Sequence, residues 1–147
     1  MSLFKKLIQD AEKLPKPSEQ VFEEIHANKD AIVEDLNNHL HRSKKLQRYA
    51  KDNSNNVDII NHNNLFTFLE SFSSKWKPEL LVRSTLWVYK SYRKSGFDKK
   101  YWKIFYKAYF KSTKANISKE SFNELQSFYA WIRRNHGTFM ELSAEDK

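Results

Sequence analysis

The chain has 147 residues, enough for one domain with a substantial core and too few for two ordinary ones. It contains no cysteine, which excludes disulfide bonds and thiolate chemistry and fits a reducing, cytoplasmic compartment. The net charge is +8, and no stretch of the sequence is typical of a secretory signal or a membrane span. Because only two glycines and three prolines punctuate it, we expect a single all-α domain of six or seven helices.

The positive charge is concentrated in the central third of the chain. Residues 73–114 carry 12 Lys or Arg against 2 Asp or Glu, whereas the segments on either side are close to neutral. The same third holds 11 of the 22 aromatic residues. The unusual part of the sequence is therefore both basic and aromatic, and a binding surface is most expected there.

The first 17 residues are predicted to form an N-terminal amphipathic arm. Apolar residues recur at helical spacing between positions 3 and 14, Ser2 is a suitable N-cap, and Pro15 ends the pattern. We expect this arm to pack on the core.

The helical core is predicted to span residues 18–142. Ser18 is positioned to cap its first helix, and the apolar pattern then continues past residues 28–30, where the helix is expected to bend or break. A cluster of short polar residues at 52–56 is typical of a loop.

The helix boundaries are more clearly marked in the second half of the core. Pro78 fits the first turn of a helix and Gly96 fits its left-handed C-terminal stop. Asp98 and Ser118 are suitable N-caps for the two helices that follow. Residues 143–147 are predicted to be a loose tail.

The helix predicted at residues 99–115 has two contrasting faces. One face is aromatic and predicted to be buried, while the other presents five lysines within one narrow stripe. Because few acids compensate this charge, the stripe is expected to attract a polyanion, although a merely solvated helix face is an equal alternative. The candidate residues, including cations of the preceding helix, are Lys100, Lys103, Lys107, Lys111, Lys114, Arg83, Lys90, Arg93 and Lys94.

Trp131 lies on the polar side of the last predicted helix, away from its apolar stripe. Either another part of the chain covers it or it is exposed as a contact anchor, a role in which Trp and Arg are common. With its neighbours Arg133 and Arg134, it forms a candidate interface for a homodimer or a partner protein.

The abundance of aromatic residues is also consistent with an apolar ligand pocket. For any single residue, the alternative that its ring simply fills the core is favoured over a role in a pocket. The pocket candidates are Phe66, Leu69, Trp87, Tyr92, Trp102 and Phe105.

No motif indicates catalysis, a cofactor or a metal ion. Three of the five histidines stand four residues from an aspartate, but a di-iron bundle needs two Glu-x-x-His elements and only Glu23 with His26 provides one. The sequence has neither a Gly-rich phosphate loop nor a Gly-x-Ser-x-Gly motif. We therefore expect a protein that is not an enzyme and binds no metal.

Three segments follow one another in a suggestive order: residues 25–32 (IHANKDAI), the helix at 78–93, and the helical pair ending at 129–132 (YAWI). This order resembles the haem-free globin-like sensor domains at the N-termini of bacterial stressosome proteins, over roughly residues 20–136. The resemblance implies a globin-like fold, a homodimer built on the last helices, and relay of a signal to a partner. Because residues 79–95 contain no histidine, axial haem ligation there is not supported.

Two functional interpretations follow. The first is a non-catalytic regulatory or sensor-like module that relays a signal by binding a partner or an apolar ligand. The second is a nucleic-acid-binding helical protein, or a small ribonucleoprotein subunit, that uses its basic helix face. A purely structural oligomer is a third class.

Overall fold

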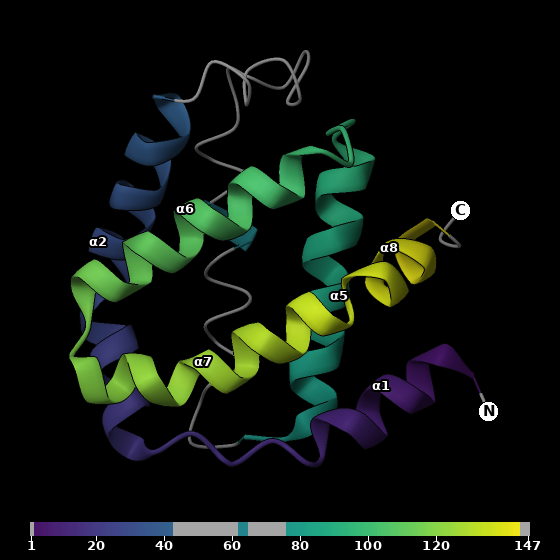
Figure 1. The fold of residues 1–147 in the computed structure, drawn as a ribbon, viewed down its shortest axis with the longest axis horizontal. Coiled ribbons are helices and arrows are strands. Elements are labelled where there is room, and N and C mark those ends of the chain that lie inside the picture. Colours follow the sequence, from purple (N-terminus) through teal and green to yellow (C-terminus); the bar gives the residue numbers. More distant parts are fainter. Residues whose placement is uncertain (1, 43–61, 65–75, 145–147) are drawn as a thin grey trace.

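The structure is a computed structural model that describes residues 2–42, 62–64 and 76–144. The predicted all-α fold is confirmed: these residues contain helices and no strand. The helices are α1 Leu3–Ala11, α2 Glu19–His41, α5 Pro78–Lys94, α6 Tyr101–Asn116, α7 Lys119–Arg134 and α8 His136–Ala144 (Figure 1).

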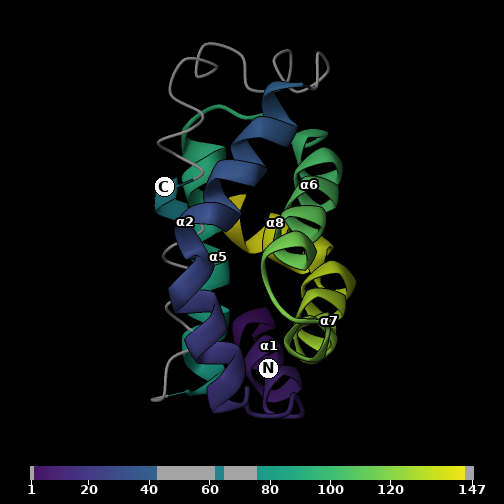
Figure 2. The same ribbon diagram turned by 90° about the vertical axis from the view of Figure 1, so that its left-hand side faces the viewer.

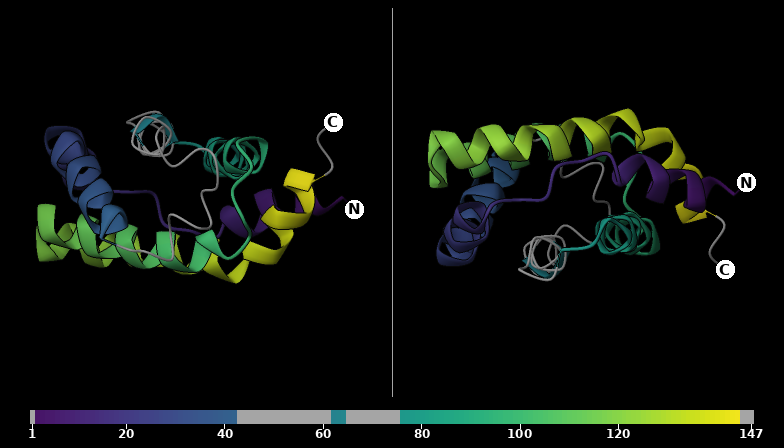
Figure 3. Two further views of the ribbon diagram at one scale, coloured as in Figure 1. Left: turned by 90° about the horizontal axis from the view of Figure 1, so that it is seen from above. Right: turned by 90° about the horizontal axis from the view of Figure 1, so that it is seen from below.

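The helices are arranged in two layers around the core. Helices α6 and α7 lie in one layer and α5 lies in the other, as Figures 2 and 3 show from three directions. Helix α2 packs on α6 and α7 at one end, while α1 and α8 pack on α5 at the other.

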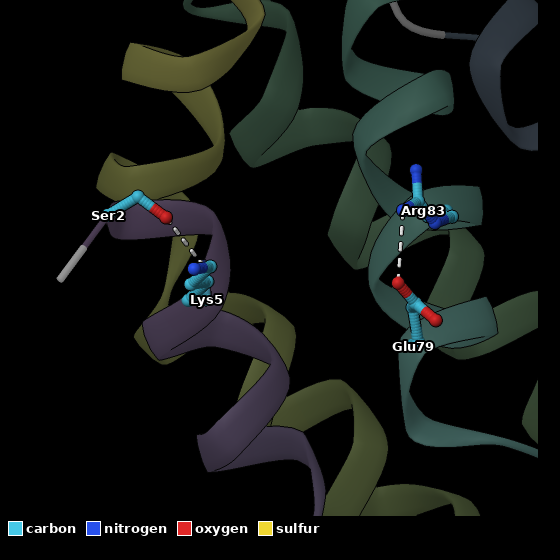
Figure 4. Close-up of polar contacts among 4 residues, drawn as sticks. All are labelled: Ser2, Lys5, Glu79 and Arg83. Atoms are coloured by element: carbon cyan, nitrogen blue, oxygen red, sulfur yellow. Dashed lines mark hydrogen bonds and ion pairs between the residues drawn. The ribbon is translucent and has the colours of Figure 1, made fainter.

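Local capping signals set most of the helix ends. The Ser2 hydroxyl accepts the Lys5 N–H at 3.2 Å and begins α1 (Figure 4), and Ser18 and Ser118 cap α2 and α7 in the same way. Pro78 occupies the first turn of α5, and Gly96 follows its end with φ 82°, the left-handed conformation that glycine adopts most easily.

The structure corrects two predicted boundaries. Helix α2 runs without a break through residues 28–30, where the Asn28 amide donates to the Glu24 carbonyl one turn earlier. The predicted tail begins too early, since Ser143 is buried in α8 and its hydroxyl accepts a hydrogen bond from Arg93 Nε at 3.1 Å.

Two reciprocal sets of hydrogen bonds join α2 to α7. The Ser118 N–H and hydroxyl donate to the Glu24 carboxylate at 2.7 and 2.8 Å, and the Ser121 hydroxyl donates to the same group. In return, the Ser18 N–H and hydroxyl donate to Glu124 at 3.0 and 2.7 Å. Each helix thus supplies a carboxylate to the N-terminus of the other, where the helix dipole favours negative charge.

The Glu24 carboxylate is stabilised in its ionised form. The hydrogen bonds from Ser121 and then from Ser118 lower its pKa from 4.5 to about 2. A third link lies nearby, where the Asn116 amide at the end of α6 donates to Asp35 of α2 at 2.6 Å. Helix α2 therefore holds the point at which α6 ends and α7 begins.

We expect Glu24→Gln to lower the free energy of unfolding at pH 7 by about 1–2 kcal/mol, the low end for charged hydrogen bonds because the carboxylate is partly exposed. Since folding lowers the pKa, the stabilisation is complete above pH 4.5 and is lost as the pH falls towards 2. Urea unfolding at pH 7 and pH 3 measures the free energy of unfolding of wild type and variant. The difference between the two proteins should be smaller at pH 3 than at pH 7.

Glu23→Gln is the matched control, because Glu23 is the exposed neighbour on the same helix. Glu23→Gln should change the free energy of unfolding by no more than about 0.5 kcal/mol. A loss for Glu24→Gln that is equal at the two pH values would contradict the assigned role of the ionised carboxylate.

Candidate functional site

Aromatic residues of the basic third build the core between the two layers. Tyr89 of α5 stacks on Trp102 of α6 with ring centroids 4.0 Å apart. Tyr92 meets Trp102 and Phe105 edge-on, each at 5.3 Å. The predicted burial of the aromatic face of α6 is thus confirmed for Trp102, Phe105 and Tyr109.

A small pocket lies within this aromatic cluster. Its volume is about 40 Å³, room for roughly three water molecules, and the predicted residues Trp102 and Phe105 line it. Tyr92 packs against both rings, whereas Phe66 and Leu69 lie outside the described residues. Thr85 also lines the pocket, and its buried hydroxyl has no hydrogen-bond partner within the described ranges.

Trp87 does not line this pocket, so its prediction as a pocket residue is wrong. Its side chain is 45% exposed. The reason is helical geometry: Trp87 is two residues, or about 200°, from the inward-facing Tyr89, so it faces away from the core. There it lies with Lys90 and Lys94 on the outer surface of α5.

Three polar side chains meet beside the pocket. The Tyr89 hydroxyl bonds the Tyr106 hydroxyl and also His136 Nδ1, the latter at 2.7 Å. Burial raises the pKa of both tyrosines and lowers the pKa of His136. All three groups are therefore neutral at pH 7, and they link α5, α6 and α8 instead of presenting a charged nucleophile.

Helices α6 and α7 enclose a solvent-facing groove of about 370 Å³, which we call the basic groove. Three lysines of α6 and one arginine of α7 line it, together with four aromatic rings. The lining residues are Lys103, Tyr106, Lys107, Tyr109, Phe110, Lys111, Tyr129 and Arg133.

The cations of the basic groove are exposed and uncompensated. Helix α6 contains no acidic residue, and Lys103, Lys107 and Lys111 form no ion pair with any residue in the described part of the chain. They extend over about 12 Å of helix. Lys100 and Lys114 lie beyond the two ends of this row and are also exposed. Arg133, predicted as an interface residue, joins the lysines from across the groove.

The cations of α5 do not extend this row, contrary to the prediction. Because Tyr89 and Tyr92 turn inward, Lys90 and Lys94 lie with the exposed Trp87 on the outer side of α5. Helix α5 itself belongs to the layer opposite α6 and α7 (Figures 2 and 3). Arg83 pairs with Glu79 at 3.0 Å (Figure 4). The Arg93 guanidinium donates to the Met140 carbonyl of α8 at 2.8 Å.

Trp131 is fully buried within its own chain, so its prediction as an interface residue is wrong. The chain turns at Asn135, and α8 then brings Phe139 edge-on to the indole with centroids 5.5 Å apart. Next to it, Arg134 and Asn135 both contact Asp10 of α1, at 3.6 and 3.2 Å. The N-terminal arm is thus tied to the end of α7.

Comparison with protein-family models, with curated proteins and with solved structures gave no match. In the ranges that the structure describes, no group of three or more His, Cys, Asp or Glu side chains could hold a metal ion. A search of the same ranges found no helix that is long and apolar enough to cross a membrane.

We expect Trp131→Ala to lower the free energy of unfolding by about 3–5 kcal/mol, because it removes a fully buried ring. Trp87→Ala is the matched control and should cost less than about 1 kcal/mol, since that indole is on the surface. Urea unfolding measures both.

Trp131→Phe keeps an aromatic ring and removes an indole N–H that has no partner among the described residues, so it should fold with a smaller loss. Sedimentation velocity of this variant tests the alternative that Trp131 belongs to an interface between two copies of the chain. A lower sedimentation coefficient with unchanged stability would return Trp131 to an interface.

Proposed function

We propose that the protein is a non-catalytic nucleic-acid-binding module that holds backbone phosphates in the basic groove. The observation that carries the proposal is the convergence of Lys103, Lys107, Lys111 and Arg133 on one groove, where no acidic side chain of the described residues forms part of the lining. Such a site attracts phosphates through charge, and its contacts are independent of base sequence.

The support of the groove walls favours the same proposal. The end of α6 and the start of α7 are fixed to α2 through Asn116 and Ser118, so the cations project from anchored helices. Buried aromatic rings lie behind them, and a low-dielectric wall strengthens the field that a charged groove presents to an anion.

The sensor-like interpretation has less support in the described part of the chain. A pocket of about 40 Å³ is much smaller than the roughly 300–1,000 Å³ typical of ligand pockets, and the basic groove is lined by cations instead of apolar side chains alone. Regulation through a protein partner, homodimerisation and the globin-like resemblance stay predictions.

The test is the salt dependence of binding to a mixed-sequence single-stranded oligonucleotide, measured by fluorescence anisotropy. Each phosphate contact contributes about −0.7 to the slope of log affinity against log salt, so four cations should give a slope of about −2.8. Changing Lys103, Lys107 and Lys111 together to Gln should flatten this slope by about two units. Circular dichroism should show unchanged helix content, because the three side chains are exposed and Gln retains helix propensity.

A variant with Lys77, Lys90 and Lys94 changed to Gln is the matched control, because it loses the same charge from the α5 side of the protein. Its slope should stay close to that of wild type. Equal flattening in the two variants would overturn the assignment to the basic groove, and absence of binding at low salt would overturn the function itself.

A further inference from the structure

We infer that the basic groove selects single-stranded nucleic acid by stacking one base on Phe110. The inference rests on the proposed function and specifies its substrate class. It starts from the fact that Phe110 is 36% exposed and lies in the groove among the cations. Across the described ranges, the other large exposed apolar side chains are Leu80 and Trp87, and both belong to α5.

Phe110 is held in place by other rings. It meets Phe122 edge-on with centroids 4.7 Å apart and Tyr129 at 5.8 Å, with interplanar angles of 71° and 63°. These contacts restrict its rotamers while part of the ring stays open to solvent. A ring that is already fixed loses little conformational entropy when a flat partner stacks on it.

The cations around Phe110 match the layout of a nucleotide, in which each base is joined to a charged phosphate. Lys107 is one helical turn before Phe110 and Lys111 directly follows it, so a strand that stacks a base on the ring has cations beside it for its phosphates. Arg133 lines the same groove from α7. Cationic grooves that contain aromatic side chains are typical of single-strand binding, because every base has a π-face.

A duplex can place phosphates on the cations of the groove, but it has no free base to stack on Phe110. Its bases are already paired and stacked, so exposing one to Phe110 requires unstacking. Phosphate contacts alone would bind single strands, duplexes and a bare sugar-phosphate backbone through the same electrostatic attraction. Stacking on Phe110 therefore predicts a preference for single strands that carry bases, whereas the lysine contacts alone predict none.

The experiment compares three probes by fluorescence anisotropy at one salt concentration: an oligothymidylate, an abasic oligonucleotide of the same length, and a duplex of that length. Wild-type protein should bind the oligothymidylate about 5- to 150-fold more tightly than the abasic strand, the range for stacking of one base. Equal affinity for these two strands would overturn the inference, while the salt slope would still support the phosphate contacts.

Phe110→Leu is the decisive variant, because it keeps an apolar side chain against Phe122 and Tyr129 but removes the π-face. It should bind the oligothymidylate and the abasic strand equally and keep the wild-type salt slope. Phe110→Trp should restore the preference, since it restores a flat ring.

Trp87→Ala is the matched control for removal of an exposed aromatic ring, because Trp87 faces outward from the other layer. It should leave the preference for the oligothymidylate unchanged. An equal loss in Trp87→Ala and Phe110→Leu would overturn the assignment to Phe110. Failure of all three probes to bind wild type would instead overturn the proposed function.

Discussion

Glu24 of α2 lies where three helices meet, and its carboxylate accepts hydrogen bonds from Ser118 and Ser121 in the first turn of α7. Asn116, the last residue of α6, donates a hydrogen bond to Asp35, which also belongs to α2. Helix α6 packs more extensively on α2 than on α7. Both walls of the basic groove are thus anchored on α2, and direct contacts such as Phe110 with Phe122 join them to each other.

Helix α6 has an apolar side that faces the core and a basic side that faces solvent. The inward side of α6 carries Trp102 and Phe105, and the buried tyrosines around them have raised pKa values that keep them neutral. Its outward side carries lysines at intervals of three or four residues. The lysines of α6 are thus at the surface, over an apolar interior that screens their charge much less than water does. Low-dielectric material behind charged groups strengthens the field that a groove presents to an anion.

Local features of the fold could be predicted from the sequence, whereas features that depend on distant segments could not. The serine caps and the Pro78 to Gly96 helix follow from short-range patterns. The outward position of Trp87 could also have been predicted from the sequence. Trp87 lies off the stripe of Thr85, Val88 and Tyr92, which marks the inner face of the helix. Burial of Trp131 had no such signal, since it depends on the turn at Asn135 and on Phe139 beyond it. Likewise, the stripe of lysines predicted one wall of the groove, but Arg133 joins it only through the fold.

The reciprocal contacts of α2 and α7 also have a kinetic consequence. Ser18 and Glu124 are 106 residues apart, and Glu24 and Ser118 are 94 apart, so each contact closes a loop of about a hundred residues. Such closure costs roughly 4 kcal/mol of chain entropy, whereas α6 and α7 follow each other directly. We therefore expect α2 to dock late, after the α6–α7 pair has formed. In a chevron plot, Glu24→Gln should then accelerate unfolding more than it slows folding, and the reverse pattern would place this docking in the folding nucleus.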